Sequence, residues 1–136
     1  MAVTHYAKVM IGTSESVGDT IANNTTDTGV EQDMLGTTQG GTGDDASFAF
    51  AHFFLVFTST VTVGSVDVNI IAERISGQSS VDVPMRTVSV TPANATKKCF
   101  LCTLPVSRFM LVTVKNNATG ANITNVFVGS EIFKIV

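Results

Sequence analysis

Charged residues are few in this sequence. Lys, Arg, Asp and Glu make up 14% of its 136 residues, whereas about 25% is usual in soluble domains. The net charge is −3, and the eight basic residues are scattered, with Lys97 and Lys98 as the one adjacent pair. Nucleic acid binding draws its affinity from clustered Lys and Arg. The sequence therefore predicts no nucleic acid partner and a largely neutral surface.

Residues that commonly carry catalysis or hold metals are also scarce. His5 and His52 are the two histidines, neither stands in a recognisable catalytic frame, and no G-x-S-x-G motif occurs. Cys99 and Cys102 have C-x-x-C spacing, but no second cysteine pair or nearby histidine completes a zinc site. Residues three apart in a strand point to opposite faces, which predicts two separate thiols. We expect no enzyme, no catalytic residues, no metal, no cofactor and no small-molecule substrate.

Acidic residues gather at Asp27, Glu31 and Asp33, and again at Asp44 and Asp45. Loop oxygens of this kind can bind calcium, but the EF-hand spacing is absent. The nearby GGTG segment lacks the lysine and the following helix that phosphate binding requires. We interpret the region as a solvated acidic loop.

Long apolar runs and an export signal are missing too. The most apolar stretch, Ala46–Val63, is interrupted by His52 and by a run of Thr and Ser, so it falls short of the ~20 apolar residues that span a bilayer. The first residues, MAVTHYAKVMIG, lack a basic segment followed by an unbroken apolar one. We expect no membrane partner and synthesis in a cytoplasm.

The hydrophobic residues that are present alternate with polar ones at a period of two, which is typical of half-buried strands. No segment shows a sustained helical period. Pro84 confines its strand to a sheet edge or a bulge. The expected strands are Tyr6–Gly12, a weak Asp19–Val30, a strand pair within Ala46–Val63, Val66–Ile70, Val81–Met85, Val88–Val90, Phe100–Leu104, Phe109–Lys115, Ile123–Val128 and Glu131–Val136.

The Phe-rich strand is expected to form the centre of the core. One of its faces carries Phe53, Leu55 and Phe57. Its other face carries Phe48, Phe50, His52, Phe54 and Val56. Since both faces are apolar, we expect both to be covered over part of the strand's length.

Glu31–Asp45 is expected to be a long loop, because it holds four of the eleven glycines. Loops of this length in compact domains are usually functional or disordered. The apolar residues Val30, Met34 and Leu35 at its start have two interpretations. They dock on the domain itself, or they bind a partner.

About eight short strands, with turns about 8 to 12 residues apart, predict a single all-β domain over residues 1–136, an antiparallel sandwich or jelly roll. Carbohydrate-binding sandwiches usually use exposed aromatic platforms. The chain has no Trp and a single Tyr, Tyr6, which weakens the prediction of a carbohydrate-binding module. Such a module stays an alternative to a structural role.

The C-terminal third carries a pattern that resembles the small jelly-roll decoration, or cement, proteins on the capsids of tailed bacteriophages. It runs T-L-P-V-S-R-F-M-L-V-T-V-K-N-N-A-T-G over Thr103–Gly120, followed by NVFVG over Asn125–Gly129. In those proteins an L-P segment precedes a basic and an aromatic residue, an apolar strand, a T-G turn and a final strand. The matching residues here are Leu104, Pro105, Arg108, Phe109, Thr119 and Gly120.

This resemblance implies a structural virion protein that binds the outside of a phage head and stabilises subunit contacts. It also implies a homotrimer, the major capsid protein as partner, and a place on the capsid surface after synthesis in the bacterial cytoplasm. The alternative within the virion is a tail or head-fibre protein. Chain ends and long loops are free to reach neighbours, so we expect the contacts at Ala2, Val3, Thr4, His5, Tyr6, Val30, Met34 and Leu35.

Overall fold

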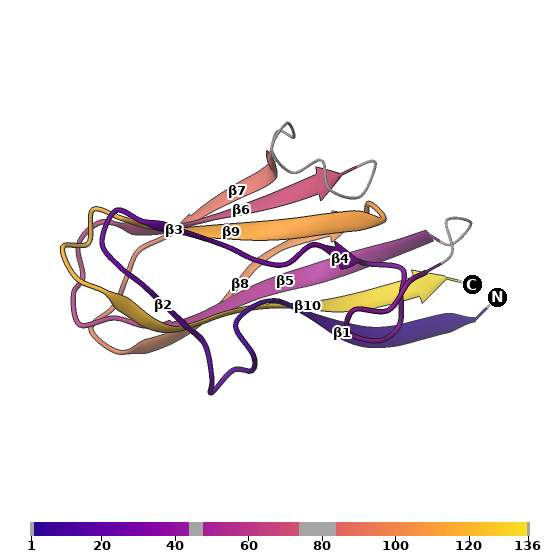
Figure 1. Ribbon diagram of the computed structural model, residues 1–136, viewed down its shortest axis with the longest axis horizontal. Coiled ribbons are helices and arrows are strands. Elements are labelled where there is room, and N and C mark those ends of the chain that lie inside the picture. Colours follow the sequence, from indigo (N-terminus) through magenta and orange to yellow (C-terminus); the bar gives the residue numbers. More distant parts are fainter. Residues whose placement is uncertain (1, 44–47, 74–83, 136) are drawn as a thin grey trace.

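The computed structural model of the chain is a sandwich of two antiparallel sheets (Figure 1). It describes residues 2–43, 48–73 and 84–135. Within these ranges the regular structure consists of strands alone, with no helix and thus no helix that could cross a membrane. The expected all-β sandwich class is confirmed.

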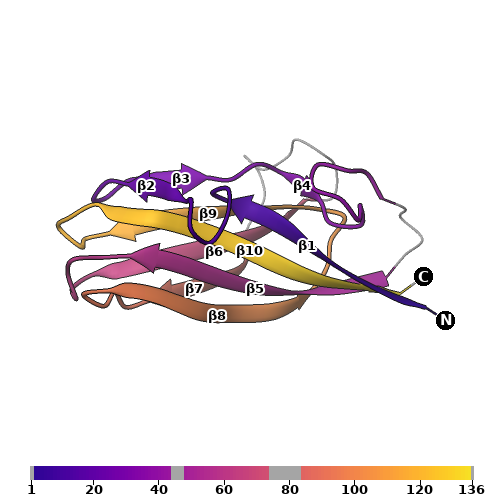
Figure 2. The same cartoon turned by 90° about the horizontal axis from the view of Figure 1, so that it is seen from below.

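The first sheet has the strand order β1-β10-β5-β8, with β2 added beside β10 (Figure 2). The second has the order β3-β9-β6-β7, with β4 added beside β9. Two sheets of four main strands, between which the chain alternates, are typical of a jelly roll. The first sheet contains β1 (Val3–Ile11), β2 (Asp19–Ile21), β5 (Phe48–Thr58), β8 (Thr96–Pro105) and β10 (Ile123–Ile135). The second contains β3 (Thr26–Thr28), β4 (Gln32–Asp33), β6 (Ser65–Glu73), β7 (Pro84–Val90) and β9 (Phe109–Asn117).

The core lies between the sheets and is built from alternate residues of each strand. On β5 the inward residues Phe53, Leu55 and Phe57 have no exposed surface. On β6 the inward residues include Val66 and Val68, which are equally buried. The period-two pattern in the sequence thus separated the two faces of each strand, and the structure shows which of them is inward.

The expected strands differ from the structure in three regions. Ala46–Val63 contains one strand, β5, rather than a pair, and Asp19–Val30 is divided into β2 and β3. The two expected C-terminal strands are one continuous β10, because Gly129 and Ser130 pair with β5 instead of forming a turn. Pro84 begins β7 at a sheet edge, as expected. The expected strand positions Val81 and Val83 lie outside the described residues.

The cysteines do not point to opposite faces of their strand, so that expectation was wrong. The register between β5 and β8 shifts at Phe53 and Phe54, with Leu101 as the extra residue. Cys99 therefore pairs with Leu55 and Cys102 with Phe53, which are both inward positions. Both thiols are free and pack in or against the core, and burial raises the pKa of each. A β-bulge changes the side-chain phase of a strand, and no pattern in the sequence indicates this one.

Gly29 is required between β3 and β4 of the second sheet, where the chain comes close to β1 of the first sheet. A Cβ placed there would lie 2.1 Å from the Met10 carbonyl oxygen, and the Gly29 amide donates a hydrogen bond to Val112 O at 2.8 Å. We expect Gly29→Ala to destabilise the fold by about 1–3 kcal/mol, because backbone must move to make room. Urea denaturation measures this loss. The control is Gly40→Ala, whose Cβ meets no atom within 4 Å, so that only its positive φ of 73° carries a cost. Equal losses in the two variants would contradict the close-packing explanation.

Candidate functional site

The contact residues expected from the sequence fall into two groups in the structure. Val3 and His5 are exposed on the edge strand β1, Ala2 is exposed just before it, and Val30 is 73% exposed. Met34 and Leu35, by contrast, lie in the chain's own core, at 0% and 5% exposure. The expectation that these two reach a partner is corrected here: they fill the space between the sheets beside β1, so of the two interpretations the intramolecular one holds for them.

The loop that follows Met34 is held by polar groups of the first sheet. The Tyr6 hydroxyl donates to Met34 O at 2.7 Å, and Lys134 Nζ donates to Leu35 O at 2.8 Å. Lys8, which is 1% exposed, donates to Thr38 O. Burial lowers the pKa of Lys8, although nearby Asp33 acts in the opposite direction. The two lysines satisfy loop carbonyls that would otherwise be buried without partners.

Asp33 fixes the other side of this loop. Its carboxylate accepts hydrogen bonds from the Leu35 amide at 3.1 Å and the Gly43 amide at 2.8 Å, and it pairs with Arg108 Nε at 3.2 Å. Burial tends to raise the pKa of Asp33, but the two amides and the guanidinium outweigh it and hold the pKa below its usual value. The residue expected to belong to a solvated acidic loop is a buried anchor instead. Asp44 and Asp45 lie outside the described residues.

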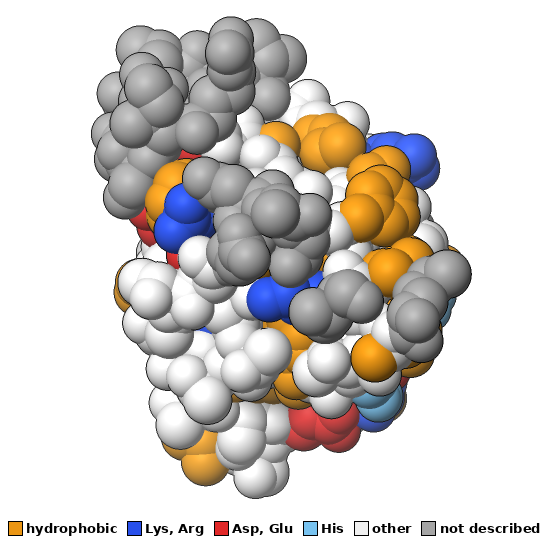
Figure 3. Space-filling model, turned by 90° about the vertical axis from the view of Figure 1, so that its right-hand side faces the viewer, with side chains coloured by type: hydrophobic (Ala, Val, Ile, Leu, Met, Phe, Trp, Pro, Cys, Tyr) orange, Lys and Arg blue, Asp and Glu red, His pale blue; other side chains and the backbone are white. Residues whose placement is uncertain are grey.

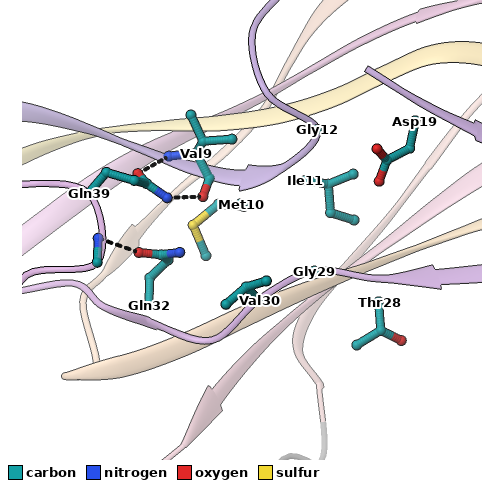
Figure 4. Close-up of a pocket in the computed structure, with 11 residues that line it drawn as sticks. Val9, Met10, Ile11, Gly12, Asp19, Thr28, Gly29, Val30, Gln32 and Gln39 are labelled. Carbon is teal, nitrogen blue, oxygen red and sulfur yellow. Dashed lines mark hydrogen bonds between the residues drawn. The ribbon is translucent and has the colours of Figure 1, made fainter. Parts of the chain in front are cut away.

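A pocket of about 420 Å³ opens on the same flank, between β1 and the chain segment at Val30 (Figure 4). Gln39 closes one end, because its side-chain amide bonds both the Val9 amide at 2.8 Å and the Val9 carbonyl at 3.0 Å. Gln32 accepts a bond from the Gly40 amide at 3.3 Å. Gln39 thus occupies the edge of β1 as a neighbouring strand would. Among the described residues, no three His, Cys, Asp or Glu side chains are grouped to hold a metal.

Two carboxyl groups meet near this pocket, where the chain passes from β2 to β3. Asp19 hydrogen-bonds Asp27, and one Asp27 oxygen is buried. Burial is the main cause that raises the pKa of Asp27 to about 6, followed by the hydrogen bond and the repulsion from Asp19. Two such groups share a proton readily. The pair links β2 of the first sheet to β3 of the second.

The outer face of the first sheet carries aromatic rings from four adjacent strands. We call it the aromatic face, and its rings are those of His5, Phe48, Phe50, His52, Phe100 and Phe133. His5 stacks on Phe133 with centroids 4.5 Å apart, and Phe133 stacks on Phe50 at 5.2 Å. His52 contacts Phe50, Phe100 and Phe133 edge-on. This row of stacked rings follows from the strand register, in which His5, Phe133 and Phe50 are direct neighbours.

Much of this face is open to solvent. Phe48 is 59% exposed and Phe100 is 64% exposed. The sequence predicted that both faces of β5 would be covered over part of its length, and here the cover is partial. It lies towards the far end of the strand, where Glu15 of the β1–β2 loop reaches Lys98 on β8 at 2.8 Å and Val56 is buried. End-on, hydrophobic side chains are visible along one flank of the molecule, close to a histidine and acidic side chains (Figure 3).

A shallow groove of about 360 Å³ lies beside the aromatic face, lined by Glu15, His52, Phe54, Lys98, Cys99, Phe100 and Glu131. The Phe54 ring lies against Gly129, so that a Cβ there would meet the ring at 2.5 Å. Lys98 sits 5.2 Å from the centre of the same ring. The missing side chain at Gly129 therefore leaves room for the Phe54 ring, which lines the groove. Sequence alternation indicated the rings, but not this hollow.

Comparison with known proteins gives a fold neighbour and no family. No family model matches the chain, and no curated protein sequence matches it. Among solved structures it is similar to one described as "Bacillus endospore appendages form a novel family of disulfide-linked pili", with a TM-score of 0.50 and 12% identity over 98% of this chain and 89% of the other. At this identity the likeness concerns the fold.

Removal of the Asp33 carboxylate should release the loop. We expect Asp33→Ala to lower the free energy of unfolding by about 3 kcal/mol, because Arg108 and two amides lose a buried partner. Thermal denaturation measures the loss, and limited proteolysis should cut first between residues 34 and 43. Glu15→Ala, which breaks an exposed ion pair, is the control and should cost less than about 1 kcal/mol. Unchanged proteolysis of Asp33→Ala would contradict the anchoring role.

The Asp19–Asp27 pair should make stability depend on pH. Because the pKa of Asp27 is raised to about 6, the folded chain binds this proton more tightly than the unfolded chain. The associated stability is present at low pH and lost as pH rises through about 6. We expect Asp27→Asn to gain about 1 kcal/mol at pH 8, after allowance for solvent screening, and to gain less at pH 4. Asp67→Asn is the control, and it should change the free energy of unfolding in the opposite direction. Burial tends to raise the pKa of Asp67, but hydrogen bonds from Ser89, Ser65 and Asn117 outweigh burial and lower this pKa.

Proposed function

We propose that this chain is a structural subunit that decorates the outside of a bacteriophage head, where it binds the major capsid protein and other copies of itself. The observation that carries the proposal is the aromatic face. Six rings on one sheet surface, two of them around 60% exposed, form a patch of the kind that marks a protein contact. Interface cores are enriched in aromatic residues and depleted of charge.

The charges near the face support a contact between proteins. Lys98 pairs with Glu15 at 2.8 Å, and His5 lies 4.0 Å from Glu131. Because the Lys98 and Glu15 charges are matched within the chain, a partner does not need to neutralise that pair. An apolar contact of this type should persist at about 1 M salt, where the Debye length is only about 3 Å.

The ring arrangement favours a protein partner over a sugar. The faces of His5, Phe133 and Phe50 are stacked on one another, so their edges point outward from the sheet. A sugar ring that stacks on an aromatic platform needs an open ring face. A protein surface can pack side chains between ring edges, as the core of a sandwich does.

A pilus-like fibre subunit is the second candidate, and the fold neighbour favours it. That neighbour is described as belonging to disulfide-linked pili. In this chain Cys102 is 5% exposed and Cys99 bonds weakly to Leu55 O at 3.7 Å. Fibres of this chain would therefore have to be held without disulfides, unless the thiols were released from the core.

Co-sedimentation with undecorated capsids of tailed phages tests the proposal. We expect the wild-type chain to pellet with capsids at 0.1 and 1 M salt, and Phe100→Asp to need about tenfold more protein for half occupancy, because a carboxylate is then buried in the contact. Val63→Asp is the matched control. Val63 is 59% exposed, close to the 64% of Phe100, but it lies in the β5–β6 turn, away from the aromatic face. Val30→Asp reports in parallel on the contact expected from the sequence.

The outcomes separate the candidates. Capsid binding that Phe100→Asp weakens and Val63→Asp leaves intact supports decoration. Filaments in electron micrographs of the chain alone, without capsid binding, would favour the fibre subunit instead. A chain that binds no capsid and forms no assembly would overturn the structural role.

A further inference from the structure

The aromatic face carries both a projection and a hollow that can receive it. Phe48 projects at the start of β5 and is 59% exposed. The groove lies farther along the same strand, between Phe54 on β5 and Phe100 on β8. A surface that holds both parts of a contact can pair with an identical surface, because in a two-fold interface residue i meets j and residue j meets i.

The spacing of the two features fits a two-fold axis. Phe48 and Phe54 are six residues apart on a continuous strand, which corresponds to about 20 Å. The midpoint is Ala51, whose outward neighbours are the rings of Phe50 and His52. Consider a two-fold axis that lies midway between the aromatic faces of two copies and runs across the strands at Ala51. This axis would place Phe48 of each copy over the groove of the other. The β5 strands of the two copies would then face each other in opposite directions.

The size of the face suits a pair of copies. Four strands spaced at about 4.8 Å and nine residues at about 3.3 Å cover roughly 600 Å². Two such faces bury about 1,200 Å², the lower limit for a specific interface. Two copies of one twisted sheet also have the same curvature, so they can pack about 10 Å apart with strands about 30° off parallel, as sandwich sheets do.

The charges of the face point to the same occupant. Lys98 and Glu15 match opposite charges within one chain, so two copies do not repel each other at that pair. A strongly acidic or basic partner would find little counter-charge on this face. The net charge of −3 per chain is small enough to permit approach.

We propose that a second copy of this chain occupies the aromatic face, packed sheet against sheet about a two-fold axis with Phe48 of each copy in the groove of the other. This inference rests on the proposed function, because of the two partners proposed there it assigns the second copy, and not the capsid protein, to the aromatic face. It adds a two-fold contact to the trimer that the resemblance to capsid decoration proteins implies.

A charge exchange within one chain tests the contact. We expect Phe48→Lys alone and Phe100→Glu alone each to raise the dissociation constant of the pair about 30-fold or more, because each buries an unmatched charge. The double variant Phe48→Lys/Phe100→Glu should recover at least tenfold of this loss, because the new ammonium of one copy then meets the new carboxylate of the other at both ends. Phe48→Lys/Phe100→Lys should recover nothing. Sedimentation velocity over a range of protein concentrations gives the dissociation constants, and the mass should halve when the pair separates.

Folding and function are controlled separately. Each variant should keep the β-sheet circular dichroism spectrum, and Val63→Lys should associate as the wild type does. The two-fold contact is wrong if the Phe48 and Phe100 single variants have the same mass as the wild type. It is also wrong if the two double variants have the same dissociation constant. Failure of the proposed function appears elsewhere, as absence of capsid binding by a wild-type chain that still pairs with itself.

Discussion

The register between β5 and β10 is the constraint on which both surfaces of the first sheet depend. Phe54 lies opposite Gly129, and Phe53 lies opposite Ser130. A slip of one residue would exchange the inward and outward side chains of β5. Phe53, Leu55 and Phe57 would then leave the core, and the outward rings would enter it. The same pairing thus fixes a closed interior and an aromatic exterior.

On the flank beside β1, the buried carbonyl groups of a loop need hydrogen-bond donors. There the short strands β2, β3 and β4 leave the space between the sheets without a long covering strand, and the loop after Asp33 fills it. A loop brings backbone carbonyls into a buried place, and each needs a donor. Lys8, Lys134 and Tyr6 supply these donors from the first sheet. Polar residues at inward positions of β1 and β10 are therefore part of the packing of this flank.

Sequence patterns predicted the sheets better than the loop. Alternation separated the two faces of β5 and β6, because a strand in a sandwich imposes a period of two on burial. It missed the bulge at Leu101, since an extra residue leaves no mark in composition. It also placed Asp33 in solvent, whereas long-range contacts with Arg108 and Gly43 bury it. Such contacts join residues 75 and 10 positions apart and cannot be predicted from local pattern. The outward rings were visible in the sequence, but their exposure was not, because it depends on which loops cover the sheet.

The exposed rings of the aromatic face would promote non-specific association unless something limited their contacts. With 14% charged residues, electrostatic repulsion gives little protection against non-specific association. The rings instead satisfy one another: His5, Phe133 and Phe50 stack at spacings close to the distance between strands. Stacking hides the ring faces and leaves a ridged surface of edges, which makes good contact only with a surface of matching shape. In more polar proteins charge limits non-specific association, whereas here the shape of the surface does so. The partners of this face are restricted to those whose side chains fit between the ridges.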